Sequence, residues 1–413
     1  MKYLLLIAAL FAAQVQAEIV QMSDRGMWYK HGEIGGTGLP SYSGNLATAT
    51  NKTMPIAVKA NDNNIYYTYS TCEEGKYKIW VTRGKDERII FRSDYCDQHD
   101  NAAIRVATDG YIWIYKAARG FWRKSYTFKS KSPYSITNGF DVVDSDYRAY
   151  PQAWSMGLIY TRYNEEKREP WVKSENCDKK LVSGGHYNVS YYDGEFIHMF
   201  YNYHKESEKS KQAKILAKSQ IKQMSEVEYI KYVAMTADLN HRINLYYMRS
   251  ANGCDWQNAS GEALSLPLDT DSDKTRVYKG DEFIYLKDIK VVNGVPRALV
   301  AKSTTWNPTT GTRELYEIDS YGNETYITNQ NHNYDGAAYF GNNSQFIVAV
   351  KSRDFGYTGG AMFFYHKGEE IGGISNGNAD NYPRKIIGFR GFLFSGSSSS
   401  IEDNGDSAVY MFK

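Results

Sequence analysis

Apolar and polar residues alternate over short stretches through most of this 413-residue chain. Runs of about four to seven residues rich in Ile, Val, Phe, Tyr and Trp are separated by turn sequences, for example at 108–110, 192–194, 292–294 and 321–323. Turn signals spaced about 8–12 residues apart between such runs are typical of all-β proteins. The pattern therefore predicts an all-β fold with little helix.

Several of the predicted strands look like copies of one unit, usually placed after a Gly-containing turn and before a more polar strand. Central strands of these units are expected at 111–115, 158–162, 196–201, 283–286, 346–350 and 391–394. A repeat of roughly 40–65 residues suits propeller blades of about four strands, and seven blades fit the chain length best. We therefore predict a seven-bladed β-propeller in which a strand at 408–412 closes the ring with N-terminal strands.

One segment departs from the strand pattern. Residues 205–238 are charged, contain no Gly or Pro, and place apolar residues at spacings of three to five, namely Leu216, Ile221, Met224, Val227 and Ile230. This spacing predicts one or two amphipathic helices inserted between two strands. Two interpretations of this segment stay open. It is a solvent-exposed insertion that covers the edge of a blade, or it forms a lid or channel wall at the substrate site.

The first 17 residues have the form of a secretory signal peptide. Lys2 precedes an apolar run from 3 to 13, and the segment ends with the small-residue pattern Val15-Gln16-Ala17. No later run approaches the roughly 20 apolar residues of a transmembrane helix. We therefore expect a secreted or periplasmic protein whose mature part, 18–413, is a single β-propeller catalytic domain.

The charge balance limits the classes of partner. The chain has a formal net charge of +2, so it has no overall electric field that would attract nucleic acid or a membrane. Neither is therefore expected as a partner. Any recognition of an anion must depend on a local group of positive charges. Tyr occurs 36 times, which favours strands and provides platforms for sugar rings. A monomer that binds an acidic polysaccharide is expected.

The four cysteines of an exported chain make one or two disulfides reasonable. Cys72 and Cys96 flank a predicted strand pair and could bridge neighbouring strands, whereas Cys177 and Cys254 lie in polar turns. The sequence does not fix the pairing. A zinc site is the alternative, although no close Cys-x-x-Cys spacing supports it.

Residues able to form an anion site lie between 99 and 168. His99, Arg119, Tyr150 and Arg162 each come at the end of a predicted strand. If these strands converge on one face of the β-scaffold, an imidazole, two guanidiniums and a phenol would together bind an anion and offer a group for proton transfer.

A set of short motifs resembles the BNR-repeat-containing proteins of marine and soil bacteria. The motifs lie at 99–104, 110–114, 118–120, 133–136, 150–152, 184–187, 202–204, 244–247, 285–289, 331–335 and 357–360. The same layout is similar to the seven-bladed propeller lyases that act on uronic-acid polysaccharides, namely the ulvan lyases and rhamnosyl-glucuronate lyases. The resemblance implies a seven-bladed fold and cleavage of an acidic glycan by β-elimination.

Carried over position by position, the resemblance implies that Tyr150 serves as base and acid and that His99, Arg119 and Arg162 neutralise the uronate carboxylate. It also implies substrate binding by Arg242, Tyr246, Lys287, His186 and His332. The sequence departs from the lyase pattern at Arg119, which stands where those enzymes have a second His, and in a shorter loop between Tyr150 and Arg162. An Arg can pair with a carboxylate in bidentate fashion, so the first departure keeps the chemistry.

Elimination requires these residue types. The proton at C5 of a uronate is weakly acidic because its loss places a second negative charge beside the carboxylate. Fixed cations aimed at the carboxylate stabilise that charge, and they lower the pKa of a neighbouring phenol so that it can act as a base. No cofactor is therefore required, although a structural calcium or zinc ion remains compatible with the sequence.

Two other functions stay open. A propeller glycoside hydrolase would normally need two carboxylates at the scissile bond, whereas the motifs are dominated by cations and Tyr, with Asp100 and Asp335 among the few acidic residues. A non-catalytic propeller that binds acidic glycans would use the same Arg and aromatic residues. Each candidate also has a structural interpretation: Tyr150 and His186 could simply pack, His99 could cap a turn, and Arg242 and Lys287 could be surface charges.

Overall fold

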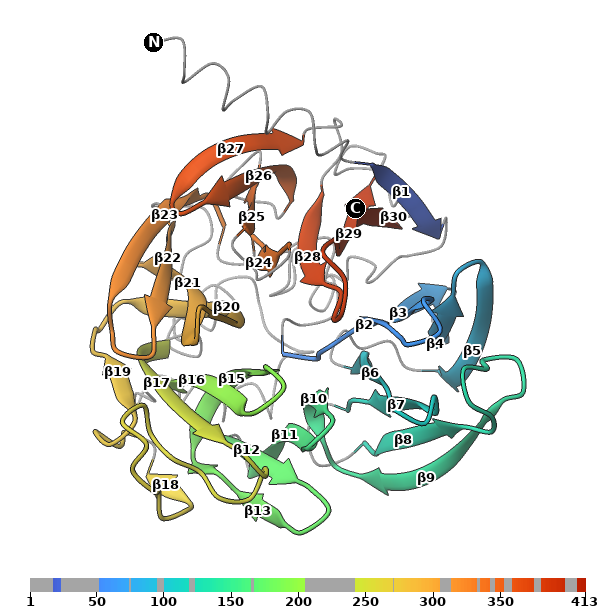
Figure 1. The fold of residues 1–413 in the computed structure, drawn as a ribbon, viewed down its shortest axis with the longest axis horizontal. Coiled ribbons are helices and arrows are strands. Elements are labelled where there is room, and N and C mark those ends of the chain that lie inside the picture. Colours follow the sequence, from blue (N-terminus) through green and yellow to red (C-terminus); the bar gives the residue numbers. More distant parts are fainter. Residues whose placement is uncertain are drawn as a thin grey trace, which may run out of the picture.

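Seven four-stranded antiparallel sheets surround a central axis as the blades of a propeller (Figure 1). The computed structural model describes residues 18–23, 52–73, 76–94, 100–118, 123–164, 167–204, 242–269, 271–304, 313–332, 335–341, 346–352, 359–374, 380–397 and 407–413. The all-β, seven-bladed architecture predicted from the sequence is confirmed. Within these ranges no helix could cross a membrane.

Each blade runs from an inner strand at the axis to an outer strand at the rim. The first four blades contain β2 (Ala57–Lys59), β3 (Ile65–Glu73), β4 (Lys76–Arg83) and β5 (Asp86–Ser93); β6 (Ala102–Val106), β7 (Ile112–Lys116), β8 (Ser125–Ser130) and β9 (Phe140–Asp146); β10 (Ala149–Trp154), β11 (Gly157–Asn164), β12 (Lys167–Lys173) and β13 (Asp178–Lys180); and β15 (Gly185–Tyr192), β16 (Ile197–His204), β17 (Arg242–Ser250) and β19 (Arg276–Tyr278).

The remaining three blades follow the same order. They contain β20 (Phe283–Val292), β21 (Val295–Ser303), β22 (Arg313–Asp319) and β23 (Glu324–Gln330); β24 (Ala337–Phe340), β25 (Phe346–Ser352), β26 (Gly360–His366) and β27 (Glu369–Ile374); and β28 (Asn381–Lys385), β29 (Phe392–Ser397), β30 (Ser407–Phe412) and β1 (Ile19–Ser23). A short parallel pair, β14 (Val182–Ser183) with β18 (Leu268–Asp269), joins the third and fourth blades.

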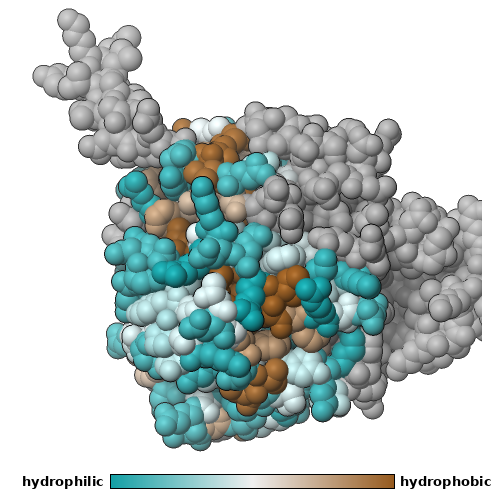
Figure 2. Space-filling model, turned by 90° about the vertical axis from the view of Figure 1, so that its right-hand side faces the viewer, coloured by the Kyte–Doolittle hydropathy of each residue, from teal (hydrophilic) through white to brown (hydrophobic). Residues whose placement is uncertain are grey.

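Burial falls from the axis to the rim because neighbouring blades cover both faces of an inner strand. All six residues of β10 are buried, whereas most of β9 and β27 is exposed. The largest apolar cluster lies between blades and includes Trp154, Phe200 and Leu286 of three consecutive blades. Seen from the side, the surface is mainly hydrophilic, with separate hydrophobic groups between the polar residues (Figure 2).

The ring is closed by strands from both ends of the described chain. β1 forms the outer strand of the last blade and pairs antiparallel with β30, with Ile19 opposite Phe412. The backbone N–H groups of Glu18 and Lys413 each donate to the other residue's carbonyl at 3.1 Å. The predicted closure by a strand near 408–412 is therefore confirmed.

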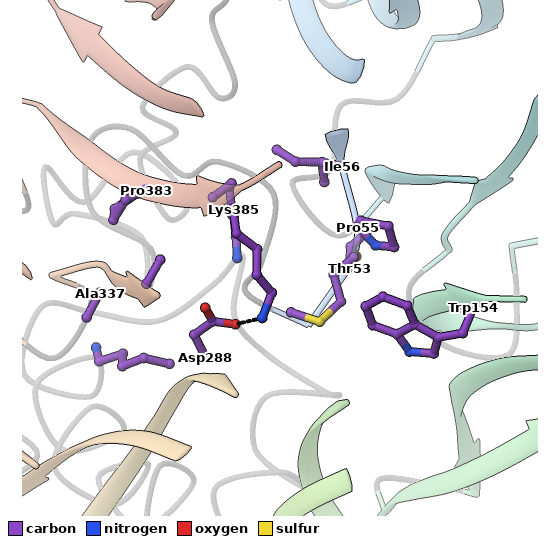
Figure 3. A pocket seen from close by; sticks show the side chains of 12 residues that line it. Thr53, Pro55, Ile56, Trp154, Asp288, Ala337, Pro383 and Lys385 are labelled. Carbon is purple, nitrogen blue, oxygen red and sulfur yellow. Dashed lines mark hydrogen bonds and ion pairs between the residues drawn. The ribbon is translucent and has the colours of Figure 1, made fainter. Parts of the chain in front are cut away.

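The segment 52–59, which ends in β2, crosses the hub and ties several blades together. Met54 N donates to Pro151 O at 3.0 Å, Ile104 N donates to Pro55 O at 2.8 Å, and Lys59 N donates to Ile387 O at 2.8 Å. Figure 3 shows Thr53, Pro55 and Ile56 among the inner strands. This segment is therefore a structural element of the hub.

A disulfide joins Cys177 to Cys254, with the Cα atoms 5.9 Å apart. It links the turn between β12 and β13 to the chain that follows β17, so it connects two neighbouring blades. Cys96, the Cys72 side chain, the predicted signal peptide 1–17 and the predicted helical insertion 205–238 lie outside the described residues, so those expectations stay predictions.

We predict that the double substitution Cys177→Ser with Cys254→Ser lowers the melting temperature by several degrees. The bond closes a loop across 77 residues, and cross-links of this kind stabilise folded proteins by about 2–4 kcal/mol, largely by restricting the unfolded chain. Thermal unfolding followed by circular dichroism measures the effect. Ser174→Ala is the matched control, because the Ser174 hydroxyl contacts both sulfur atoms but its loss leaves the bond in place. An unchanged melting temperature in the double variant would contradict the prediction.

Candidate active site

Four inner strands share a β-bulge near their beginning. The pairing with the next strand shifts between 149 and 152 in β10, 185 and 188 in β15, 286 and 288 in β20, and 381 and 384 in β28. The bulges contain Tyr150, Tyr187, Lys287 and Tyr382. Bulges redirect side chains and are common beside active sites. Because all inner strands begin on the same face of a propeller, these four residues belong to one face of the ring.

Tyr150 has a backbone that few non-glycine residues adopt. Its φ is +51°, and it precedes Pro151, whose carbonyl oxygen accepts the Met54 N–H of the hub segment. Tyr382 in the last blade has the same features, with φ of +56° and Pro383 following it. Such conformations persist where the surroundings enforce them, and they cluster at functional sites.

The Tyr150 hydroxyl lies within a group of three phenols, here called the phenol cluster, formed by Tyr150, Tyr163 and Tyr187. Its oxygen is 3.2 Å from the Tyr163 hydroxyl and 3.5 Å from the Tyr187 hydroxyl. The rings of Tyr150 and Tyr187 meet edge to face, with their centroids 5.4 Å apart. A proton can therefore pass between Tyr150 and a neighbouring hydroxyl without a large movement.

Arg168 supplies positive charge to the phenol cluster. It lies directly across the β11–β12 hairpin from Tyr163, and its guanidinium carbon is 5.4 Å from the Tyr163 ring centroid and 5.1 Å from that of Tyr187. Burial, followed by the neighbouring Tyr163 and Tyr187, raises the pKa of Tyr150 well above its ordinary value, whereas Arg168 acts in the opposite direction. The Tyr150 phenol is therefore protonated at neutral pH in this structure.

Two further cations share the Tyr187 ring. The Arg242 guanidinium carbon is 4.4 Å from the Tyr187 centroid and 4.8 Å from that of Tyr285, while the Lys52 ammonium is 5.3 Å from the Tyr187 centroid. Lys52 also donates to the Leu286 carbonyl oxygen at 2.5 Å. Aromatic faces attract cations, so Tyr187 joins the phenol cluster to the charged hub.

We call Lys52, Lys287, Arg313 and Arg384 the hub cations; all four are buried. Burial first, and then the positive charges of Arg242, Lys287 and Arg384, hold the pKa of Lys52 well below its ordinary value. Burial also lowers the pKa of Lys287 to about 7 and that of Arg384 to about 10. Such mutual repulsion between buried cations indicates a place where an incoming anion would be stabilised.

The two carboxylates beside the hub cations are already engaged. Asp288 forms an ion pair with Lys385 at 2.7 Å, shown by the dashed line in Figure 3. Asp335 accepts bonds from the backbone N–H groups of Asn331, His332 and Ser352 and from the Ser352 hydroxyl. The hub cavity itself is small, about 20 Å³, and Lys287, Asp288, Arg384 and Lys385 line it. It has room for a water or ion, not for a sugar.

The structure brings Tyr150, Arg242, Lys287 and His332 to this face of the ring. Burial, Arg313 and Lys287 lower the pKa of His332 to about 3, so its imidazole is neutral. Tyr246 lies elsewhere on the fourth blade, where its hydroxyl donates to Asp271 and its ring stacks on Tyr201. His99, Arg119 and the His186 side chain lie outside the described residues.

Arg162 is not brought to the Tyr150 hydroxyl. Consecutive residues of a strand point to opposite faces, so Arg162 faces away from its neighbour Tyr163. Its guanidinium binds Asp146 at 2.7 Å and lies 4.5 Å from the Trp171 ring centroid, on the side of the second blade. Arg168 takes the position beside the phenols that the sequence analysis gave to Arg162.

Four residues of the site were not predicted from the sequence, namely Arg168, Tyr163, Tyr187 and Lys52. Arg168 could have been found from hairpin register, since a pairing of Asn164 with Lys167 places it opposite Tyr163. Lys52 gave no comparable signal, because the chain before it shows no strand pattern. Within the described ranges no three His, Cys, Asp or Glu side chains are grouped as metal ligands, and the expectation that no cofactor is required stays a prediction.

The fold resembles that of polysaccharide lyases of known structure. No family model matches the chain, and no curated protein matches its sequence. An ulvan lyase that defined a new polysaccharide lyase family aligns with a TM-score of 0.60 at 14% identity, over 95% of both chains. A structure of an ulvan lyase of this kind bound to -[GlcA(1-4)Rha3S]- aligns with 0.61 at 14% identity, again over 95% of both chains. The polysaccharide lyase Uly1 aligns with 0.58 at 10% identity, over 96% of this chain and 99% of its own.

At these identities the likeness shows a shared seven-bladed fold. Membership of the BNR-repeat proteins stays a prediction, because no family model supports it.

We predict that inorganic sulfate stabilises this protein through the hub cations and that Lys52→Met removes most of that effect. A ligand bound only by the folded state at ten times its Kd adds about 1.4 kcal/mol to the free energy of unfolding. The added stability should fall as the pH rises through about 7, because Lys287 then loses its proton and the anion loses one partner. The stability added by sulfate is measured by thermal unfolding in sulfate and in chloride of equal ionic strength.

Lys129→Met is the matched control for this experiment. Lys129 also lies over aromatic rings, 4.2 Å from the Tyr111 centroid and 5.2 Å from that of Trp113, but it belongs to the second blade and is remote from the hub. It therefore reports the general effect of sulfate on protein stability. Equal sulfate stabilisation of the two variants would rule out an anion site at Lys52.

Proposed function

We propose that this protein is a polysaccharide lyase that cleaves a uronic-acid-containing glycan by β-elimination. The observation that carries the proposal is the Tyr150 hydroxyl, held beside two other phenols, with Arg168 and Arg242 over the Tyr187 ring of the same phenol cluster. A group that can exchange protons thus lies among fixed cations, which is the arrangement that elimination beside a carboxylate requires. The shared fold with lyases supports the same conclusion.

In the proposed reaction the cations act on the substrate carboxylate. Removal of the C5 proton shifts electron density onto the carboxylate oxygens, and Arg168 and Arg242 stabilise the resulting enediolate electrostatically. The C4–O4 bond then breaks, the electron pair of the C5 carbanion forms the C4–C5 double bond, and O4 takes up a proton. His99 and Arg119 join this set in the proposal, as the resemblance implies.

Tyr150 is proposed to exchange the proton in both steps. Because its pKa is raised, Tyr150 carries its proton at neutral pH and has it available for the departing O4. To act first as base it must lose its own proton, and the hydroxyls of Tyr163 and Tyr187, at 3.2 and 3.5 Å, provide a route for that loss. The cationic surroundings stabilise the phenolate while it is present.

The substrate proposed is a uronic-acid-containing polysaccharide such as ulvan, in which glucuronate alternates with sulfated rhamnose. The ulvan lyase solved with -[GlcA(1-4)Rha3S]- supports this choice, as do the positive charges of Arg168 and Arg242 at the phenol cluster. The protein is proposed to act outside the cytoplasm as a monomer, in keeping with the predicted signal peptide.

A non-catalytic glycan-binding propeller is the second candidate. The burial of Tyr150, which is 1% exposed, and its raised pKa favour it, because a buried protonated phenol is a poor base. A glycoside hydrolase ranks lower, since Asp335 is bound by four donors and Asp288 by Lys385.

We predict that Tyr150→Phe abolishes formation of 4,5-unsaturated uronate ends while leaving the polysaccharide bound. Loss of a general acid and base typically costs on the order of 10²–10⁴ in rate. The product is followed by its ultraviolet absorbance, and binding by calorimetry with the intact polymer. Wild-type release of saturated sugars would identify a hydrolase, and binding without any product from the wild type would identify a binding protein.

We predict opposite outcomes for two arginines of the third blade. Arg168→Ala should lower kcat on the order of 10²–10³, because removing one preorganised donor of the transition state has an effect of that size. Arg162→Ala should keep kcat within a few-fold of the wild type, because Asp146 binds that side chain on the other face of β11. A large loss in Arg162→Ala together with an active Arg168→Ala would reverse the assignment of the two residues.

A further inference from the structure

A second concave region lies between the fourth and fifth blades. It has a volume of about 230 Å³, roughly that of one or two sugar rings, and is much larger than the hub cavity. Its lining includes Asn258, Ser260, Lys274, Val277 and Tyr321. We call this region the interblade groove.

The interblade groove opens on the face of the ring opposite Tyr150. In a blade whose inner strand begins on one face, the turns that join the first strand to the second and the third to the fourth lie on the other face. Tyr321 is in the turn between β22 and β23, the third and fourth strands of its blade. Ser320 N in the same turn donates to Pro296 O, beside the turn from β20 to β21, at 2.9 Å.

Tyr321 presents an exposed aromatic ring on a rigid support. It is 68% exposed, more than any other large hydrophobic side chain in the described ranges. The Asp319 carboxylate accepts the backbone N–H groups of Tyr321 and Asn323, both at 2.9 Å. Gly322 has φ of +87°, and a Cβ there would lie 2.4 Å from Val277 O, so the turn rests directly on β19. Its position is therefore fixed before any ligand arrives.

The opposite wall is also fixed and carries polar groups. Asn258 donates to Glu262 at 2.8 Å and to the Lys274 carbonyl oxygen at 3.2 Å, which holds the turn at 258–262. Arg276 forms ion pairs with Asp271 and Asp273. Lys274 is exposed and makes no ion pair within the described part of the chain, so its ammonium is available to an acidic group.

The geometry points to the interblade groove as a second glycan-binding site, which holds a stretch of acidic polysaccharide away from the site of cleavage. A sugar ring would stack on Tyr321, its hydroxyls would bond to Ser260, and its carboxylate or sulfate would pair with Lys274. The inference rests on the proposed function for the choice of polymer. A second site of this kind would retain the protein on long polysaccharide chains, and the chemistry at Tyr150 would be unchanged.

The test is affinity electrophoresis of the full chain in gels that contain ulvan, with hydroxyethylcellulose as the neutral polymer. All variants carry Tyr150→Phe so that the polymer stays intact. Adding Tyr321→Ala should weaken retardation by ulvan roughly three- to tenfold, the range expected for losing one aromatic contact. Adding Lys274→Ala should also weaken retardation by ulvan, and the retardation that remains should be less sensitive to the salt concentration. Adding Tyr321→Trp keeps a ring and should preserve retardation.

Tyr326→Ala is the matched control, since Tyr326 is 48% exposed on the same blade but does not line the interblade groove. Equal retardation of the Tyr321→Ala variant and its Tyr150→Phe parent would overturn the assignment of the interblade groove as a glycan-binding site. An equal loss of retardation in Tyr326→Ala and Tyr321→Ala would overturn it as well. The proposed function is judged separately, by whether the wild type forms unsaturated ends. If retardation depends on Tyr321 but the wild type forms no unsaturated ends, the interblade groove is upheld as a glycan-binding site and the proposed lyase activity is contradicted.

Discussion

Positive charge buried around one axis is the constraint on which the functional face depends. Lys52, Lys287 and Arg384 repel one another in a region shielded from water, and burial together with this repulsion lowers the pKa of Lys52. Isolated buried charges are costly, so the fold must stabilise each of them. It does so with the Leu286 carbonyl oxygen for Lys52 and with the rings of Tyr187 and Tyr285 for Lys52, Lys287 and Arg242.

The same constraint explains why the site lies at bulges. A regular inner strand would point its side chains toward the neighbouring blades, where they would be covered by apolar packing. The extra residue in β10, β15, β20 and β28 turns a side chain toward the end of the strand instead. Tyr150, Tyr187 and Lys287 therefore reach one space from three different blades.

The sequence predicted the repeated unit well because blades are built from local patterns. Alternation and turn residues mark each strand, and the repeat spacing together with the chain length indicates the number of blades. The site was only partly predictable because it depends on register and on contacts between blades. Arg162 and Arg168 lie on opposite faces of the β11–β12 hairpin, so an error of one residue in the predicted register would exchange the faces assigned to them. Lys52 reaches the hub through a segment without periodicity, so its role appears only when the fourth and fifth blades are assembled around it.

Stability and function share residues at the hub, and the two can be separated by what each residue touches. Lys52 holds the hub segment to the fifth blade through Leu286 O while its charge faces Tyr187. A neutral replacement therefore relieves repulsion with Arg242 and Lys287 but loses a buried hydrogen bond, and these effects on stability oppose each other. Anion affinity has no such compensation, because removal of the charge can only weaken it. Binding measurements thus report the functional role of the hub cations more directly than the stability of the unliganded protein.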